Sequence, residues 1–295
     1  MPSDPATVVR RFNRSYTQRI GALEDSFLGM GLPLGTARLL FEIGAEPATV
    51  HDLRARLGLD SGYLSRLLRQ LEQESLVTLT PDPADRRRRR VELTPAGRAA
   101  WDDLEHRSEE RARQLVDPLT PRQQARLAEA LATADLLVRA ATVSLEAVDP
   151  VSAQAQQAMT AYFRELDARF PDGFDAGSQS SKDAELLRPP QGTFVVAVSD
   201  GAPVACGGVQ TIDGDVTYGE IKRMWVHDDW RGAGLGSRLL RHLEGVAREL
   251  GHRVVRLDTN DALVEAIALY QRAGYTEIER YNDNTYARHF FEKRL

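Results

Sequence analysis

In the C-terminal half, the pattern of apolar residues predicts a strand, then a glycine-rich turn, then a helix. Residues 216–226 hold Val, Tyr, Ile, Met, Trp and Val among a few polar residues, as a largely buried strand does. From Leu235 onward, apolar side chains recur at helical spacing, and Gly232, Gly234 and Gly236 fill the turn. Such a turn lets backbone N–H groups converge at a helix N-terminus, a geometry that holds a pyrophosphate.

Further strands and helices alternate through this half of the chain. Asp200 and Gly201 favour a hairpin between two of the strands. The segments at 171–190 and 281–286 carry no residue pattern that indicates which molecule they would contact. Strands are predicted at 142–148, 193–199, 203–212, 253–259, 275–279 and 286–293, and helices at 153–170, 235–250 and 263–273.

The N-terminal half begins with helical patterns at 6–29 and 34–46 and then contains two shorter helices. Thr49 is placed to cap the first of these, and Gly58 ends it. The second begins at Ser61 and turns a row of leucines inward. This is a helix-turn-helix, whose second helix enters the major groove of DNA by its N-terminal residues. The predicted DNA contacts on this helix are Ser61, Gly62, Tyr63, Ser65, Arg66 and Arg69.

Two strand-like segments, 76–79 and 90–94, flank a loop with five consecutive arginines, 86–90. The chain has a net charge of −5, which argues against bulk nucleic-acid binding. Residues 48–98, however, hold 10 Arg against 7 acidic residues. An arginine run is usually a solvated loop, but a basic tip beside a recognition helix can reach phosphates or a narrow minor groove. We therefore predict a winged helix.

The spacing Asp85-x-Arg87, followed by Leu93-Thr-x-x-Gly97, resembles the MarR family of winged-helix regulators. The resemblance extends from residue 6 to about residue 141. It implies that Arg87 enters the minor groove and that Asp85 helps to position it.

The same resemblance implies that the first helix and the helices at 95–117 and 122–141 form a dimerisation region. A homodimer bound to double-stranded DNA at a roughly palindromic operator is then expected. The alternative is a winged helix that serves only as a dimerisation scaffold. The N-terminal domain is predicted to be rich in α-helix and to span residues 1–141.

Arg231-x-x-Gly234-x-Gly236 matches the Arg/Gln-x-x-Gly-x-Gly/Ala element of the GNAT superfamily of N-acetyltransferases, and the resemblance covers residues 142–295. It implies an α+β domain with a mixed, mostly antiparallel sheet, and acetyl-coenzyme A as cofactor. It also supports cofactor contacts from the strand that precedes the turn. The predicted cofactor-binding residues are Met224, Trp225, Val226, Arg231, Gly232, Ala233, Gly234, Leu235, Gly236, Ser237 and Asn260.

Acetylation of an amine requires a base, because an ammonium of pKa about 10.4 is protonated near neutral pH and only the free amine attacks a thioester. Glu220, on the strand that leads to the glycine turn, is the candidate. The GNAT resemblance supports a glutamate on this strand in that role. The alternative is a carboxylate paired with Lys222 or Arg223.

The leaving thiolate benefits from an acid, and Tyr270 is the candidate. It lies in Ala266-x-x-Leu-Tyr270-x-x-x-Gly-Tyr275, which matches a GNAT element whose tyrosine lies near the coenzyme sulfur. A tyrosine on an amphipathic helix can also be core packing. The family often has asparagine where this chain has Leu263, so Asn260 is expected to take over that contact, or the contact is absent.

Composition favours a cytoplasmic protein without a membrane segment. No long apolar run and no signal-peptide pattern are present, and the single cysteine, Cys206, suits a reducing compartment as a buried structural thiol. No metal site is predicted. The sequence thus favours an N-acetyltransferase that acts on a small molecule or a protein lysine and is fused to a DNA-binding regulator. The alternative is a regulator whose GNAT domain senses acyl-coenzyme A without turnover.

Overall fold

The computed structural model describes residues 4–46, 48–83, 85–175, 177, 184–199, 201–213 and 217–295. Asp200 of the predicted hairpin, residue 216 of the predicted strand, and residues 176 and 178–183 of the 171–190 stretch lie outside these residues. The chain forms two compact units, Met1–Ala128 and Glu129–Leu295. The predicted division after residue 141 stays a proposal about where the two functional modules meet.

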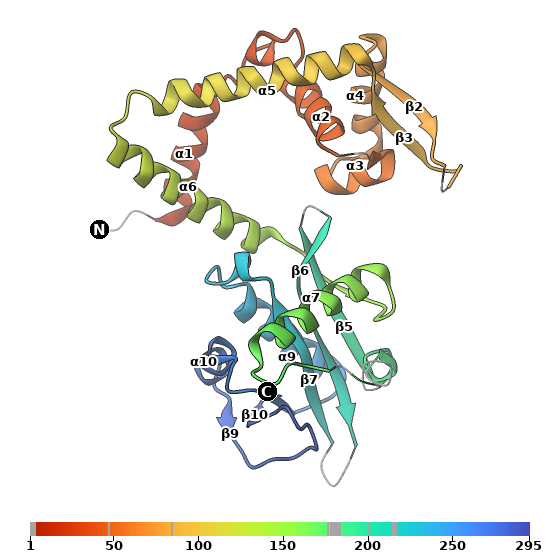
Figure 1. Ribbon diagram of the computed structural model, residues 1–295, viewed down its shortest axis with the longest axis vertical. Coiled ribbons are helices and arrows are strands. Elements are labelled where there is room, and N and C mark those ends of the chain that lie inside the picture. The colour runs from red at the N-terminus through yellow and green to blue at the C-terminus, as the bar shows by residue number, and fades with distance from the viewer. Residues whose placement is uncertain are drawn as a thin grey trace. The chain divides into compact units, whose positions relative to one another are not determined.

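The first unit contains helices and a small sheet (Figure 1). The three strands form an antiparallel sheet in the order β1-β3-β2. The elements of the first unit are α1 (Pro5–Arg19), η1 (Phe27–Gly29), α2 (Leu34–Ala45), β1 (Ala48–Thr49), α3 (Val50–Leu57), α4 (Ser61–Gln73), β2 (Val77–Pro81), β3 (Arg89–Leu93) and α5 (Pro95–Val116). Helix α6 (Pro121–Thr142) begins in this unit and continues into the second.

Local capping positions the helix-turn-helix as the sequence predicts. The Thr49 hydroxyl accepts from the N–H of Asp52, and the Asp52 carboxylate accepts from the N–H of Thr49, so a capping box starts α3. Gly58 ends α3 with a φ of 61°, and Asp60 caps α4 by accepting from the Tyr63 N–H at 2.9 Å.

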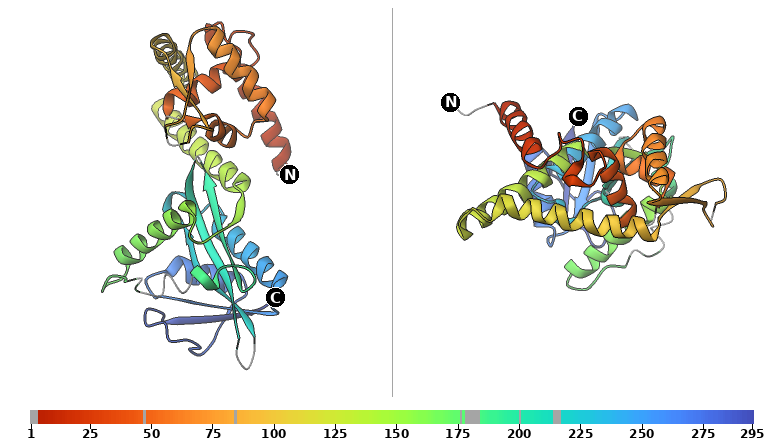
Figure 2. Two further views of the ribbon diagram at one scale, coloured as in Figure 1. Left: turned by 90° about the vertical axis from the view of Figure 1, so that its right-hand side faces the viewer. Right: turned by 90° about the horizontal axis from the view of Figure 1, so that it is seen from above.

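The apolar face of α4 is buried in the core of the first unit through Leu64, Leu67, Leu68 and Leu71. The β2–β3 ribbon pairs from Val77 with Leu93 to Pro81 with Arg89. The ribbon projects away from the helices of this unit (Figure 2). The predicted winged helix is therefore confirmed, with each strand shifted by one or two residues.

The second unit is built on a seven-stranded sheet in the order β4-β5-β6-β7-β8-β10-β9. All neighbouring strands are antiparallel except β7 and β8, which are parallel. Its elements are β4 (Leu145–Val148), α7 (Ala153–Arg169), β5 (Gly192–Ser199), β6 (Ala202–Ile212), β7 (Tyr218–Val226), η2 (Asp228–Trp230), α9 (Leu235–Glu249), β8 (Val254–Thr259), α10 (Val264–Arg272), β9 (Thr276–Glu277) and β10 (His289–Arg294).

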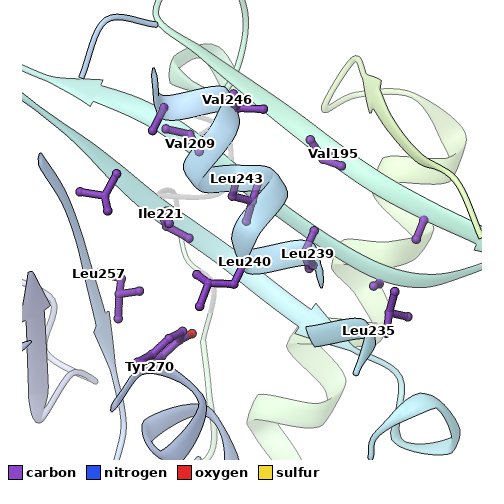
Figure 3. Close-up of a cluster of buried hydrophobic side chains, with 14 of the residues drawn as sticks. Val195, Val209, Ile221, Leu235, Leu239, Leu240, Leu243, Val246, Leu257 and Tyr270 are labelled. Carbon is purple, nitrogen blue, oxygen red and sulfur yellow. The ribbon is translucent and has the colours of Figure 1, made fainter. Parts of the chain in front are cut away.

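Helix α9 covers one face of this sheet and α7 covers the other. Leu235, Leu239, Leu240 and Leu243 of α9 pack against side chains such as Val209 of β6 (Figure 3). On the opposite face, Ala155 and Ala158 of α7 pack with Phe194, Val196 and Cys206. Alternate residues of each strand therefore enter opposite cores, and burial raises the pKa of the Cys206 thiol, as expected for a structural cysteine.

Several predicted element boundaries were wrong. The strand predicted at 286–293, for example, starts only at His289, and the one at 275–279 is limited to Thr276–Glu277. The expected helix at 6–29 ends at Arg19, because Gly21 takes a φ of 76° and turns the chain. The expected strand at 142–148 starts only at Leu145, because α6 continues to Thr142. Its last turns bury Ala140 in the core of the second unit, and that packing extends the helix past the predicted boundary.

Candidate active site

Strands β7 and β8 diverge part-way along their length. Their parallel pairing covers only Gly219 with Val255 and Glu220 with Arg256. On its other side, β7 pairs with β6 through a bulge at which Arg223 takes a φ of 57°. Beyond Glu220, the edge of β7 that faces β8 carries no ladder pairing among the residues that the structure covers, so its backbone groups line an opening.

The first cavity in this opening has a volume of about 480 Å³ and extends from the glycine turn to Tyr270. Tyr162 and Leu166 of α7 form another wall. Most of the predicted cofactor-binding residues lie on it, namely Met224, Trp225, Val226, Arg231, Gly232, Gly234, Gly236 and Ser237.

The glycine turn fits a phosphate group. Gly232 and Gly234 have φ values of 80° and 82°, and a Cβ at either would meet no described atom within 4 Å, so the space above the turn is open. Gly234 starts α9 without a side-chain cap among the described residues, so the first-turn N–H groups have no side-chain acceptor there. These groups and the cavity behind them suit a coenzyme A diphosphate and its pantetheine arm.

Arg231 connects the glycine turn to β7 and α7 through hydrogen bonds beside this cavity. Its guanidinium donates to the Val226 carbonyl at 2.9 Å and to the Glu165 carboxylate at 2.6 Å. The Trp225 indole N–H also donates to Glu165, at 2.8 Å, and Arg169 pairs with the same carboxylate. Sequence reasoning missed Glu165 and Arg169, because a charged position on an amphipathic helix is normally solvated.

A second cavity, of about 400 Å³, adjoins the first. Its lining includes Glu220, which reaches it from β7, and Asp258, which reaches it from β8. The residues that line both cavities are Tyr162, Leu166, Met224, Leu263, Ala266 and Tyr270. A ligand in the first cavity can therefore meet a ligand in the second cavity near Met224 and Tyr270.

Glu220 is only 4% exposed and lies at the polar end of the second cavity. Its carboxylate accepts from the Gln210 amide at 2.7 Å and from the Asn282 amide at 3.1 Å. The Lys222 ammonium lies 3.1 Å from it. The ion pair between Glu220 and Lys222, which was the alternative to a catalytic base, is thus present. The Glu220 side chain also lines the second cavity.

Lys222 joins Glu220 to a second buried carboxylate, Asp258, at 2.7 Å. Asp258 also accepts from Asn282 at 2.6 Å and from Asn284 at 2.7 Å. Burial opposes ionisation of Asp258, but Lys222 and these amides outweigh it and lower its pKa. Burial likewise opposes the charge on Lys222, yet the two carboxylates raise its pKa. Asp258 and Lys222 therefore both stay charged in this buried cluster.

Tyr270 projects from α10 to the junction of the cavities. Its hydroxyl lies 3.9 Å from the Met224 sulfur. Burial, with smaller contributions from nearby groups, raises the pKa of this phenol. The hydroxyl therefore stays protonated at neutral pH and is available as a proton donor.

Three of the predicted cofactor-binding residues lie elsewhere. Ala233 and Leu235 pack into the core beneath the turn. Asn260 lines the second cavity, where its amide donates to the Tyr286 carbonyl at 2.6 Å and accepts from the Ala262 N–H. Contact between Asn260 and the cofactor stays a prediction. Leu263, where the family pattern has asparagine, lines both cavities.

The predicted DNA-contacting residues form an exposed surface on the first unit. On α4, Arg66 stacks over the Tyr63 ring at 5.4 Å, and Ser61, Gly62, Ser65 and Arg69 are exposed.

At the tip of the β2–β3 ribbon, the Asp85 carboxylate accepts from the Arg87 N–H at 3.0 Å and pairs with Arg88 at 3.5 Å. The Arg87 side chain is exposed. Asp85 thus holds the backbone of the basic tip and leaves Arg87 outward.

Two family models match this chain. Residues 159–275 match the acetyltransferase (GNAT) family, and residues 30–88 match the MarR family. Both cavities and the winged helix involve residues within these matches.

Individual proteins also match. An IAA acetyltransferase from Azospirillum brasilense is 36% identical over 122 residues, which are 41% of this chain and 79% of that protein. An uncharacterised N-acetyltransferase from Schizosaccharomyces pombe is 33% identical over 97 residues, 32% of this chain and 59% of that protein, so the chain spans less than two thirds of it. The wild-type MarR structure from Escherichia coli is 22% identical, with a TM-score of 0.38, covering 44% of this chain and 96% of that one.

The sheet, the glycine turn and the paired cavities define an acyltransferase of the GNAT type. The chain belongs to the GNAT acetyltransferase family, and a MarR-family domain precedes its acetyltransferase domain. Among the described residues, no helix is long and apolar enough to cross a membrane.

Replacing Asp258 by asparagine should lower the free energy of unfolding at pH 7 by about 3 kcal/mol, because Lys222 loses a buried counter-charge. The folded-state pKa of Asp258 lies below its ordinary value of 3.8. Its contribution is therefore complete above pH 3.8 and is lost as the pH falls through the folded-state value. Urea unfolding between pH 7 and pH 3 should show the deficit of Asp258→Asn shrinking in acid. The exposed Glu249→Gln is the control, and a deficit that does not change with pH would contradict the assignment.

Proposed function

We propose that the chain is an acetyl-coenzyme A-dependent N-acetyltransferase of an amine, fused to a regulator that binds double-stranded DNA. The observation that carries the enzymatic part is the junction of two cavities at Met224 and Tyr270. One cavity begins at the glycine turn, and the other is lined by the buried carboxylates of Glu220 and Asp258. A two-substrate transfer needs such a junction, because the reacting groups must approach from separate sides.

Coenzyme A, when bound, would supply the acetyl group as a thioester. The N–H groups of residues 232–237 would hold its diphosphate, and the free edge of β7 at 224–226 would align its pantetheine arm. The backbone N–H groups around Met224 and Trp225 would donate to the developing oxyanion. Asn260 could join through its second amide N–H, because only one of the two donates to the Tyr286 carbonyl.

Glu220 would take the proton of the incoming ammonium, directly or through one water. A carboxylate has about four acceptor positions, and the Gln210, Asn282 and Lys222 contacts leave room for a water from the cavity. The neutral amine could then attack. Tyr270, which stays protonated, would deliver a proton to the departing sulfur.

Glu220→Gln and Tyr270→Phe should each lower kcat by about 100-fold while changing the affinity for coenzyme A little, because each removes a proton-transfer group and keeps the shape. Thiol release with an amine panel measures the rate, and calorimetry measures coenzyme A binding.

Matched controls exist in the same unit, Glu244 on α9 and Tyr275 just before β9. Glu244→Gln removes a buried carboxylate paired with Lys293, and Tyr275→Phe removes a buried phenol that packs 5.9 Å from Tyr270. Unchanged rates in both test variants would defeat the assignment. Tight coenzyme A binding without product on any amine would favour a sensor that does not turn over.

One observation favours the second function, in which the GNAT domain senses acyl-coenzyme A without turnover. The end of α6, the helix shared by both units, is anchored beside the first cavity, where Arg139 lies 4.7 Å over the Trp230 ring. Trp230 lines that cavity, and Arg238 of α9 donates to the Ala140 carbonyl at 2.8 Å. Occupancy of the cavity could thus bias a helix that continues into the MarR-family domain.

The MarR-family domain would act as a cytoplasmic homodimer. Helix α1 has no buried residue, and it exposes Val8, Val9, Phe12 and Tyr16, an apolar surface that a second copy could cover. Phe12→Asp should therefore shift the chain from dimer to monomer in sedimentation velocity. A monomeric unaltered chain would contradict the dimer.

Arg87→Ala should weaken binding to operator DNA and reduce the slope of log affinity against log salt by about 1, because one phosphate-proximal cation is lost. Binding to the promoter of its own gene, titrated between low and moderate salt, provides the measurement. Arg253→Ala, an exposed arginine of the second unit, removes the same charge and should have no effect. If the slope of log affinity against log salt is the same for Arg87→Ala and the unaltered chain, the β2–β3 wing does not contact DNA through Arg87.

A further inference from the structure

The side chains that line the second cavity differ in chemistry. The lining includes the buried carboxylates of Glu220 and Asp258. It also includes the aromatic rings of Phe170, Phe174 and Tyr286. The cavity thus offers both charged and aromatic side chains to the same occupant.

The aromatic surface is packed and held in place. Phe174 lies 4.9 Å from the Tyr286 ring, and Phe170 lies 5.9 Å and 5.8 Å from these two rings. The Tyr286 hydroxyl accepts from the Asp175 N–H at 3.1 Å, and its carbonyl accepts from Asn260 at 2.6 Å. A surface fixed in this way can receive a flat apolar group without rearrangement.

The charge of the described lining is negative. Its acidic residues are Asp175, Glu220, Asp258 and Asp283, and its basic residues are Lys222 and Arg223. Lys222 is paired with two of the carboxylates, and the Arg223 guanidinium lies 5.1 Å over the ring of Phe163. The charges of Glu220, Asp258, Lys222 and Arg223 balance, so the excess negative charge comes from Asp175 and Asp283, which are exposed. These two carboxylates favour an ammonium over a carboxylate as the cavity's occupant.

The volume limits the size of the occupant. About 400 Å³ lies near the lower end of the range of roughly 300–1,000 Å³ found for small-molecule sites. One ring with a short alkyl chain fits such a space, with the ring beside Phe174 and the nitrogen toward Met224 and Tyr270.

We propose that the acceptor is a primary arylalkylamine that carries no carboxylate. This inference rests on the proposed N-acetyltransferase function. The ammonium gives one proton, through Glu220, to solvent. The nitrogen then forms a C–N bond as the thioester C–S bond breaks. Tyr270 protonates the sulfur and regains the second nitrogen proton, so the products are the amide and free coenzyme A.

The test uses the full chain, acetyl-coenzyme A and five acceptors: phenethylamine, phenylalanine, propylamine, spermidine and a lysine peptide. The value of kcat/KM for phenethylamine should exceed that for each of the others by tenfold or more. In Phe174→Ala, the ratio of kcat/KM for phenethylamine to that for propylamine should fall about tenfold, because only the ring loses a partner. Since this is a ratio within one variant, a partial loss of folded protein cancels.

The failures are distinguishable. If none of the five amines is acetylated, the proposed function fails and this inference falls with it. If spermidine, phenylalanine or the lysine peptide is preferred, N-acetyltransfer stands and the arylalkylamine is excluded. A ratio that Phe174→Ala leaves unchanged also overturns the inference, because the rings would then serve only to pack the fold.

Discussion

The divergence of β7 from β8 is the constraint on which the site depends. Parallel pairing stops at Glu220 and Arg256, and the bulge at Arg223 turns the rest of β7 away. The opening exposes one edge of β7 to a ligand, and it separates two cavities that still meet at Met224 and Tyr270. Had the ladder continued, backbone hydrogen bonds would have closed the space that the cofactor and the acceptor need.

The triad of Glu220, Lys222 and Asp258 lies where this divergence begins. A buried ammonium between two buried carboxylates is costly to desolvate, and the surrounding amides of Gln210 and Asn282 offset part of that cost. The same arrangement lowers the pKa of Asp258 and keeps that carboxylate ionised. One interaction therefore connects the stability of the diverging strands with the proposed proton transfer.

Local signals in the sequence predicted much of this protein, and long-range contacts account for what was missed. The period change at the glycine turn identified β7 and α9, and Thr49 and Gly58 identified the helix-turn-helix, because caps and periodicity are local. Asp258 was placed on a strand but not in the site, since its partner Lys222 is 36 residues away. Glu165 was missed for the same reason: it meets Arg231 across 66 residues, and no spacing pattern records such a contact.

The central claim is that coenzyme A and the acceptor occupy separate cavities and meet at Met224 and Tyr270. A crystal structure of the full chain with coenzyme A bound tests it most directly. We predict diphosphate oxygens within hydrogen-bond distance of the N–H groups of residues 232–237, and the sulfur at the junction beside Tyr270. A diphosphate bound elsewhere, or a sulfur directed away from the second cavity, would contradict the account.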